Sequence, residues 1–307
     1  MLWLTWRQHR VQLLLTAGLL LALATGLYLN ALGALDAANG QFSTLCRLGA
    51  IGCRQVDEGL QAWYDASYPY LASLPVLSVL LGVFWGAPLL SREFERGTYR
   101  LAWTQSVSRS SWLLGKLGPL ALAAAVSGLA FGLMIDAWLR VFPGISGTFK
   151  ETQFFSVVGV ASVAWWLFAF VLGAAVGVML KKVIPAIAVT ALVFFTMYAA
   201  LFMLRPHYAE PVYQELDGSN PALINALVLD SGRVAPDGHR YSLNYYPEEC
   251  RQGKGTDTCF AAHGYRNFVE YQPADRFWRF QWTEAGILFA VTAVLGGVTM
   301  AGTVRRR

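Results

Sequence analysis

Six long apolar runs constrain the fold of this 307-residue chain more than any other feature. A helix needs about 20 apolar residues in a row to cross a bilayer, and the runs are of this order. Only 14% of the residues are charged and 55% are hydrophobic, whereas roughly a quarter of a soluble domain is charged. We therefore predict an all-α integral membrane protein with six transmembrane helices, at residues 11–35, 70–90, 117–135, 154–180, 183–204 and 285–302.

The segments between the runs suggest three parts. Residues 1–204 contain an N-terminal segment and the first five spans, residues 205–283 are polar, and residues 284–307 contain the sixth span and a basic tail. A cleaved signal peptide is the alternative for the first run, because residues 31–38 are rich in small side chains. The run is longer than the roughly 7 to 15 apolar residues of such signals, which favours a retained span.

Aromatic and basic side chains share one side of a predicted short helix before the first span. They are Trp3, Trp6, Arg7 and Arg10. An amphipathic segment of this kind lies in the membrane interface, so we expect membrane lipid to be its neighbour.

The distribution of basic residues predicts the orientation of the spans. Twelve of the 24 Lys and Arg residues fall at the two ends of the chain and in the short connections after spans two and four, against two carboxylates, Glu93 and Glu95. The opposite loops spread the other twelve over longer segments that hold 16 acids. Lys and Arg concentrate in short cytoplasmic segments, so both termini are predicted to be cytoplasmic.

All four cysteines lie in segments that this orientation places outside the cell. Cys46 and Cys53 are in the first outer loop, and Cys250 and Cys259 are in residues 205–283. Disulfides persist outside the cytosol, so we predict two local pairs and an external, disulfide-stapled segment of mixed or irregular structure between spans five and six. Four free thiols, or pairs that cross between the loops, are the alternatives.

The interiors of the predicted spans contain no Asp, Glu, Lys, Arg or His. Carriers coupled to protons or ions place ionisable groups there as relays, so a transporter with these spans would draw its energy from elsewhere. Small residues four positions apart allow close helix packing, which we expect within one bundle, with a dimer seam as the alternative. They are Gly18, Ala22 and Gly26, Gly82 and Gly86, Gly128 and Gly132, and Gly173 and Gly177.

Several other function classes find no support. The chain has no G-x-S-x-G, H-E-x-x-H or G-x-x-x-x-G-K-[ST] motif, which argues against an enzyme and against a nucleotide site of its own. His207, His239 and His263 show no metal-ligand spacing, so no metal is expected. The sequence pI of about 9.1 reflects basic residues at the ends of apolar runs rather than on a soluble face, so no nucleic-acid partner is expected.

The connection at residues 91–116 is the longest charged interruption on the predicted cytoplasmic side. Gly97 is suited to the left-handed conformation that ends a helix, and Thr98 is suited to cap the next one. A short surface helix is then predicted at residues 99–105, and Ser108 or Ser110 is predicted to cap the third span.

Two motifs in this connection resemble the type-2 ABC-transporter permeases, the membrane subunits of many bacterial exporters. They are R-E-F-E-R-G-T-Y-R-L-A-W-T-Q-S-V-S-R at residues 92–109 and W-L-L-G-K-L at residues 112–117. The pattern is similar to the family's E-x-E-x-G-T, helix, S-x-R and G-K sequence. The opening L-T-W-R-Q-H-R is similar to the start of actinobacterial members.

The resemblance implies a mechanism and partners. A coupling helix at residues 99–105 would dock on a separate cytoplasmic ABC ATPase subunit, which would bind ATP and Mg while this chain binds no cofactor. Two ATPase copies would rock two permease subunits, expected as a homodimer in the bacterial plasma membrane, and move a substrate outward. The Leu, Phe, Ala and Gly residues of the spans fit a hydrophobic or amphipathic substrate, and they fit contact with lipid equally well. Glu93 and Glu95 would pair with basic residues of the ATPase, beside the N-terminal helix.

The residues that match this coupling role are Glu93, Glu95, Arg96, Gly97, Thr98, Tyr99, Arg100, Trp103, Gln105, Arg109 and Lys116. For the two carboxylates the alternative is a solvated helix end, paired locally with Arg96 and Arg100. For the chain as a whole, the alternative is a membrane-anchored receptor or assembly protein whose external segment binds a ligand or a partner.

Overall fold

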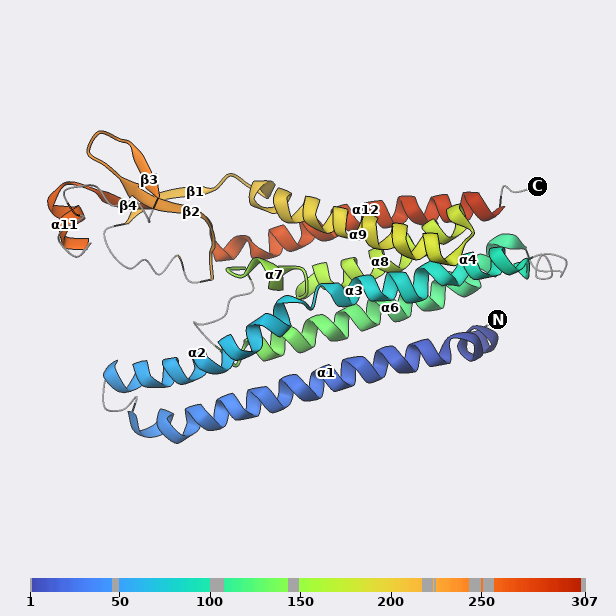
Figure 1. Cartoon of the computed structure of the whole chain (residues 1–307), viewed down its shortest axis with the longest axis horizontal. Helices are drawn as coiled ribbons and strands as arrows, with labels where there is room; N and C mark the ends of the chain where they lie inside the picture. Colours follow the sequence, from blue (N-terminus) through green and yellow to red (C-terminus); the bar gives the residue numbers. More distant parts are fainter. Residues whose placement is uncertain are drawn as a thin grey trace.

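The computed structural model describes residues 2–45, 50–99, 108–142, 149–216, 223, 225–242, 250 and 257–304. Within these ranges six helical segments are long and apolar enough to cross a membrane, with mean hydropathies between 1.8 and 2.3. This confirms the predicted number of spans. The segments lie side by side along the long axis, and both termini lie at the same end (Figure 1). We call this the terminal end and the opposite one the distal end.

The helices have the following bounds. They are α1 (Leu2–Leu45), α2 (Ala50–Ala72), α3 (Val76–Leu81), the π-helix η2 (Gly82–Gly86), α4 (Ala87–Arg96), α6 (Arg109–Leu139), α7 (Thr152–Phe155), α8 (Gly159–Leu180), α9 (Val183–Leu204), the 3₁₀ helix η3 (Arg205–Tyr208), α11 (Asp257–Ala262), the 3₁₀ helix η5 (Ala274–Arg276) and α12 (Phe277–Val304).

The helices extend beyond most of the predicted spans. The fifth span coincides with α9. The outer loop expected between the first two predicted spans, at residues 36–69, is helical for most of its length, because α1 continues to Leu45 and α2 begins at Ala50. Polar side chains support α2, where Gln61 Nε2 donates to Asp65 Oδ1 at 2.9 Å. Hydropathy indicates where a chain leaves an apolar environment, whereas a helix can continue into water.

The second span is built from several pieces. Pro75 lacks the N–H that would continue α2, and the chain turns at residues 73–75 before α3 begins. After α3, the π-helix η2 leads into α4. Such wider turns are often found at functional sites.

Helix α8 is the centre of the bundle, and 72% of its most apolar stretch is buried within the chain. It packs against α6, α9, α12 and the α3–η2–α4 segment. A Cβ atom added at Gly173 would lie 2.6 Å from Ala87 N and in overlap with Gly82 O, and one added at Gly177 would lie 2.6 Å from Ala87 O. The backbones of the second and fourth spans therefore touch directly.

The predicted small-residue pairs divide into two groups. The pairs in spans two, three and four pack within the bundle, and a Cβ at Gly128 on α6 would lie 2.9 Å from Trp166 Cβ on α8. Gly18 and Gly26 on α1 have nothing within 4 Å among the described residues. Only the first pair is thus left open toward the outside of the chain.

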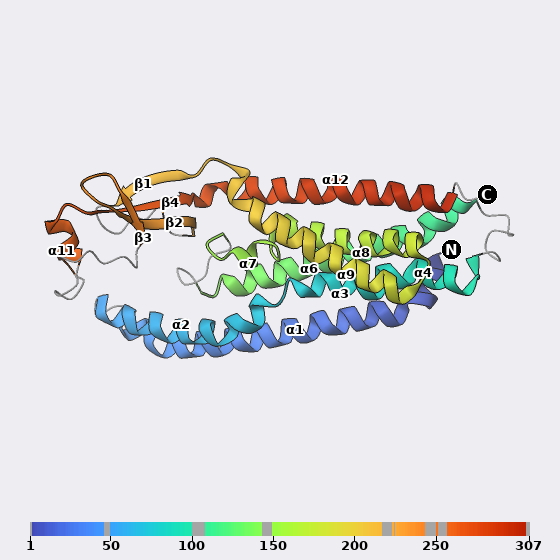
Figure 2. The same cartoon turned by 45° about the horizontal axis from the view of Figure 1, so that its top comes forward.

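The distal end carries an antiparallel sheet, which lies in residues 205–283, the segment expected to have mixed or irregular structure. Two neighbouring strands anchor the sheet to the spans, because β1 follows α9 through η3 and β4 leads through η5 into α12 (Figures 1 and 2). Gly238, with φ 84°, turns the chain between β2 and β3. The strands are β1 (Val212–Leu216), β2 (Leu227–Val234), β3 (Arg240–Ser242) and β4 (Arg266–Gln272), in the order β1-β4-β2-β3.

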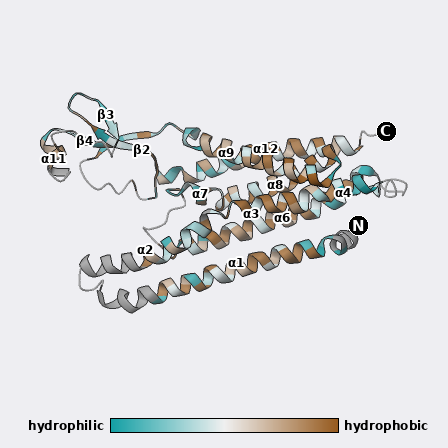
Figure 3. Cartoon of the chain, in the orientation of Figure 1, coloured by the Kyte–Doolittle hydropathy of each residue, from teal (hydrophilic) through white to brown (hydrophobic). Residues whose placement is uncertain are grey.

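Hydropathy follows this architecture. Hydrophobic residues run along the middle of the helices, while hydrophilic residues gather in the sheet and at the end of α4 (Figure 3). Helix α1 is the outermost span, and only 6% of its most apolar stretch is buried within the chain.

Replacement of Gly173 by alanine tests the backbone contact at the centre of the bundle. The methyl group would overlap the backbone of the second span, and overpacking of this kind costs about 1–3 kcal/mol. We expect Gly173→Ala to lower the melting temperature of the detergent-solubilised protein by several degrees. Gly296→Ala on α12, where nothing lies within 4 Å among the described residues, is the matched control, and equal melting of both variants would contradict this packing.

Candidate functional site: the two polar ends of the bundle

The end of α4 has the predicted local structure. Gly97 adopts φ 71° and ψ 3°, and its N–H donates to Phe94 O at 3.3 Å. This confirms that α4 ends at Arg96 through a left-handed glycine. The Thr98 hydroxyl donates back to Glu93 O at 3.5 Å, so it closes the end of α4.

Glu93 is held by a residue of the next span. Its carboxylate forms an ion pair with Lys116 Nζ from α6, and the two side chains are 23% and 10% exposed. The ammonium group also lies 4.6 Å from the centre of the Trp112 ring. Because both charges are partly removed from water, this pair is electrostatically stronger than a surface pair. It joins α4 to α6.

Glu95 is held by the start of another span. Its Oε2 accepts a hydrogen bond of 3.1 Å from the Val183 N–H, the first residue of α9. The first N–H groups of a helix lack partners within the helix and attract negative charge, and Lys182 makes no capping side-chain bond. Glu95 therefore caps α9 from a different helix.

The start of α6 completes this set of contacts. Ser108 is the N-cap, with its Oγ accepting from Ser111 N at 3.2 Å, which confirms one of the two predicted capping serines. Arg109 Nη1 donates to Val304 O at 3.4 Å, a favourable place for a cation because the C-terminal end of a helix is negative. We call the contacts of Glu93, Glu95 and Arg109 the terminal brace, which ties α4, α6, α9 and α12 together.

The remaining predicted residues at this end are only partly described. Tyr99 packs on Phe94 with a ring distance of 5.0 Å, and Arg96 is exposed. The expected coupling helix, with Arg100, Trp103 and Gln105, lies outside the described residues. The terminal brace holds both ends of this connection, at α4 and at α6.

The predicted N-terminal interfacial helix is continuous with the first span in α1. Arg7 and Arg10 are exposed on it. The side chains of Trp3 and Trp6 lie outside the described set, and placement in a membrane interface stays a prediction.

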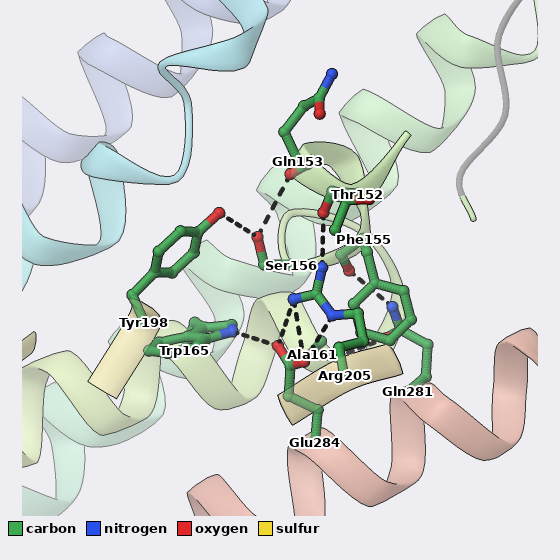
Figure 4. Close-up of polar contacts among 10 residues, drawn as sticks. All are labelled: Thr152, Gln153, Phe155, Ser156, Ala161, Trp165, Tyr198, Arg205, Gln281 and Glu284. Carbon is green, nitrogen blue, oxygen red and sulfur yellow. Dashed lines mark hydrogen bonds and ion pairs between the residues drawn. The ribbon is translucent and has the colours of Figure 1, made fainter. Parts of the chain in front are cut away.

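The distal end contains a buried ion pair that the sequence analysis missed (Figure 4). Arg205 on η3 and Glu284 on α12 are 1% and 0% exposed, with a shortest N–O distance of 3.0 Å. Arg205 Nη1 donates to Thr152 O at 2.7 Å, and Trp165 Nε1 donates to Glu284 Oε1 at 2.9 Å. The guanidinium also lies 4.2 Å from the centre of the Phe155 ring.

Gln281, one turn before Glu284, extends this network. Its Oε1 accepts from Ala161 N at 2.8 Å and its Nε2 donates to Phe155 O at 2.7 Å. Nearby, the Ser156 and Tyr198 hydroxyls are 3.2 Å apart. We call the residues around the Arg205–Glu284 pair the distal knot; it joins α7, α8, η3 and α12 where the sheet begins.

The sixth span contains an ionisable residue, so the prediction that the interiors of the spans contain none is wrong for this span. Helix α12 begins at Phe277, so Glu284 lies inside the sixth span rather than before it. The sequence feature that could have indicated this position is a single acid within the apolar sequence W-T-E-A-G-I. Both carboxylate oxygens of Glu284 bond to Arg205 or Trp165, so this residue joins helices rather than serving as a free ionisable group.

A loop carboxylate at the distal end has a perturbed pKa. Glu151 precedes α7, and burial raises the pKa of its carboxyl above the usual value. A hydrogen bond from Gln153 at 3.5 Å offsets only part of this rise. Gln153 Nε2 also donates to the Tyr68 hydroxyl of α2. These contacts link α2 to the loop before α8.

Two cysteines and one histidine of the distal segment lie close together. Ligand atoms of Cys250, Cys259 and His263 lie within 4.8 Å of one another. Cys250 and Cys259 form a disulfide, and a disulfide offers no thiolate to a metal. Cys46 lies outside the described residues, and so does the side chain of Cys53.

The distal knot predicts a strongly non-additive mutant series. Arg205→Met leaves Glu284 buried without its cation, which typically costs about 3–5 kcal/mol. We expect Arg205→Met with Glu284→Gln to recover most of the lost thermal stability in detergent. The control is Glu270→Ala at the exposed Arg240–Glu270 pair, for which about 0–1 kcal/mol is expected; additive losses at the knot would contradict the pairing.

Comparison with known proteins adds one match to this geometry. A family model described as ABC-2 membrane transporter related matches residues 17–205, which cover most of the first span, the next four spans and more than half of the chain. No curated protein and no solved structure matched in the same comparisons. The chain, with its six candidate spans, belongs to the ABC-2 membrane transporter related family, a type-2 ABC permease family.

Proposed function

We propose that this protein is the permease subunit of an ABC exporter in the bacterial plasma membrane. A separate cytoplasmic ATPase subunit hydrolyses ATP with Mg, and this chain moves a hydrophobic or amphipathic substrate outward. Family membership supports the permease role. The terminal brace is the observation that carries the proposed coupling.

The brace supports coupling because it connects one segment to several spans. A displacement of residues 97–108 would act directly on α4 and α6, and the Glu93–Lys116 ion pair holds these two helices to each other. Glu95 passes the same displacement to the start of α9. A short docking helix in this segment would thus move three spans as one body rather than bending a single helix.

The two carboxylates have different roles in this proposal. Glu93 is half-buried and uses its charge on Lys116. Glu95 is exposed and accepts one backbone hydrogen bond, which leaves its other oxygen for a basic residue of the ATPase. Residues 99–105, with Trp103 and Gln105, would occupy the ATPase groove.

The assembly is proposed as a homodimer of permease subunits with two ATPase copies. The open glycines Gly18 and Gly26 on the outermost helix α1 leave room for a close contact with a second subunit. The distal sheet supports the alternative of a receptor or assembly protein, because it offers a folded external surface. In this proposal both termini face the cytoplasm.

A charge swap tests the brace. Glu93→Gln should reduce export and substrate-stimulated ATP hydrolysis, measured with the co-expressed ATPase, by roughly 5- to 150-fold, the range of a coupling free energy of about 1–3 kcal/mol. Glu93→Lys with Lys116→Glu restores the pair and should restore most of the export. Glu270→Ala on the sheet is the control, and unchanged export in Glu93→Gln would refute the role of the brace.

Alkylation tests the orientation. If the distal end lies outside the cytosol, Cys250 and Cys259 are oxidised there, and so are Cys46 and Cys53. Mass analysis of the intact protein, alkylated without reductant, should find all four cysteines blocked from the reagent, and reduction should release them. Free thiols at both pairs would contradict the proposed orientation.

A further inference from the structure

A groove of about 580 Å³ lies between α1 and the second span, with α8 and α9 behind it. Its walls are mainly apolar, and Leu15 and Phe84 at its edges are 69% and 58% exposed. The groove therefore opens sideways, toward the surface that a bilayer covers. Its polar lining consists of Gln12, Thr16 and Arg92.

A hydrogen bond joins the two walls of the groove, at a carbonyl that a proline leaves without its usual helical donor. Phe84 O would bond the N–H four residues later, but that residue is Pro88. Gln12 Nε2 of α1 donates to Phe84 O at 3.2 Å instead. His9 Nδ1 donates to Gln12 Oε1 at 2.7 Å and so orients the amide. This polar link holds α1 beside the π-helix.

Arg92 supplies a cation at the end of the groove nearer the termini. It is exposed, and among the residues that the structure describes none is ion-paired with it. The guanidinium group binds phosphate through two parallel hydrogen bonds, and a long side chain on a span carries its charge to the headgroup level. Leu77, at the other end, lies about 22 Å away at a rise of about 1.5 Å per residue.

We propose that this groove binds an anionic phospholipid of the surrounding bilayer, with an acyl chain along the apolar wall and the phosphate on Arg92. The length of the groove suits one leaflet, because half of the hydrocarbon core is about 15 Å thick and the headgroup lies beyond it. A bilayer lipid reaches the groove directly through its open side. The lipid would fill the space between α1 and the second span, beside the π-helix. The inference rests on the membrane fold and is independent of ATP-driven export.

Native mass spectrometry of the full-length protein tests the site, with phosphatidylglycerol and phosphatidylcholine of identical chains as probes. Wild type should retain phosphatidylglycerol more tightly than phosphatidylcholine. Arg92→Gln should weaken phosphatidylglycerol binding by about tenfold, the loss of one charge-assisted contact, and should remove the preference. Arg96→Gln, on the same helix but outside the groove, should bind as wild type.

Two further variants test the position of the acyl chain. Leu80→Trp fills the groove from the second span and Leu15→Trp fills it from α1, so each should reduce the binding of both lipids. Leu15 is highly exposed, which keeps the second variant informative if the first one does not fold. Equal loss in Arg92→Gln and Arg96→Gln would indicate a general surface charge effect and overturn the proposal. Unchanged lipid binding together with a changed oligomeric state in the tryptophan variants would also overturn it, because a second copy would then occupy the groove.

Discussion

At Gly173 there is no room for a methyl group, because Ala87 N and the Gly82 carbonyl of the second span occupy that space. This backbone contact brings α8 and the second span closer than side chains would allow, and the rest of the bundle is arranged around α8. Helix α6 lies against it at Gly128, and α12 packs along another side. Helix α1, which makes few of these contacts, is left at the edge with an open groove beside it.

Among the described residues, ion pairs that join different helices lie toward the two ends of this apolar bundle, and their surroundings differ. At the terminal end Glu93 and Glu95 are partly in water and bond to Lys116 and to the Val183 N–H. At the distal end the Arg205–Glu284 pair is fully buried, and loss of one partner is costly. The first arrangement would suit the proposed coupling segment, and the second forms a buried junction between the spans and the sheet.

The spans could be predicted because burial in lipid imposes a length and an apolar composition that are visible in the sequence. The same signal cannot give helix ends: α1, α2 and α12 continue past their apolar runs into polar sequence. Local chemistry predicted the left-handed Gly97 and the cap at Ser108, because each depends on a few neighbouring residues. Glu284 was placed outside its helix because its partner, Arg205, is distant in sequence, and nothing local to Glu284 indicates a cation beside it.

The sequence by itself determined that this is a membrane protein with six spans, since hydrophobic length and the absence of charge act on each segment separately. It also carried the family resemblance in the connection after the second span. Only the tertiary structure decided which helix lies at the centre, that Glu93 and Glu95 bond to α6 and α9, and that the distal segment contains a sheet. These depend on which surfaces meet, and pairs such as Gly82 with Gly173 and Arg205 with Glu284 come together only when distant segments pack.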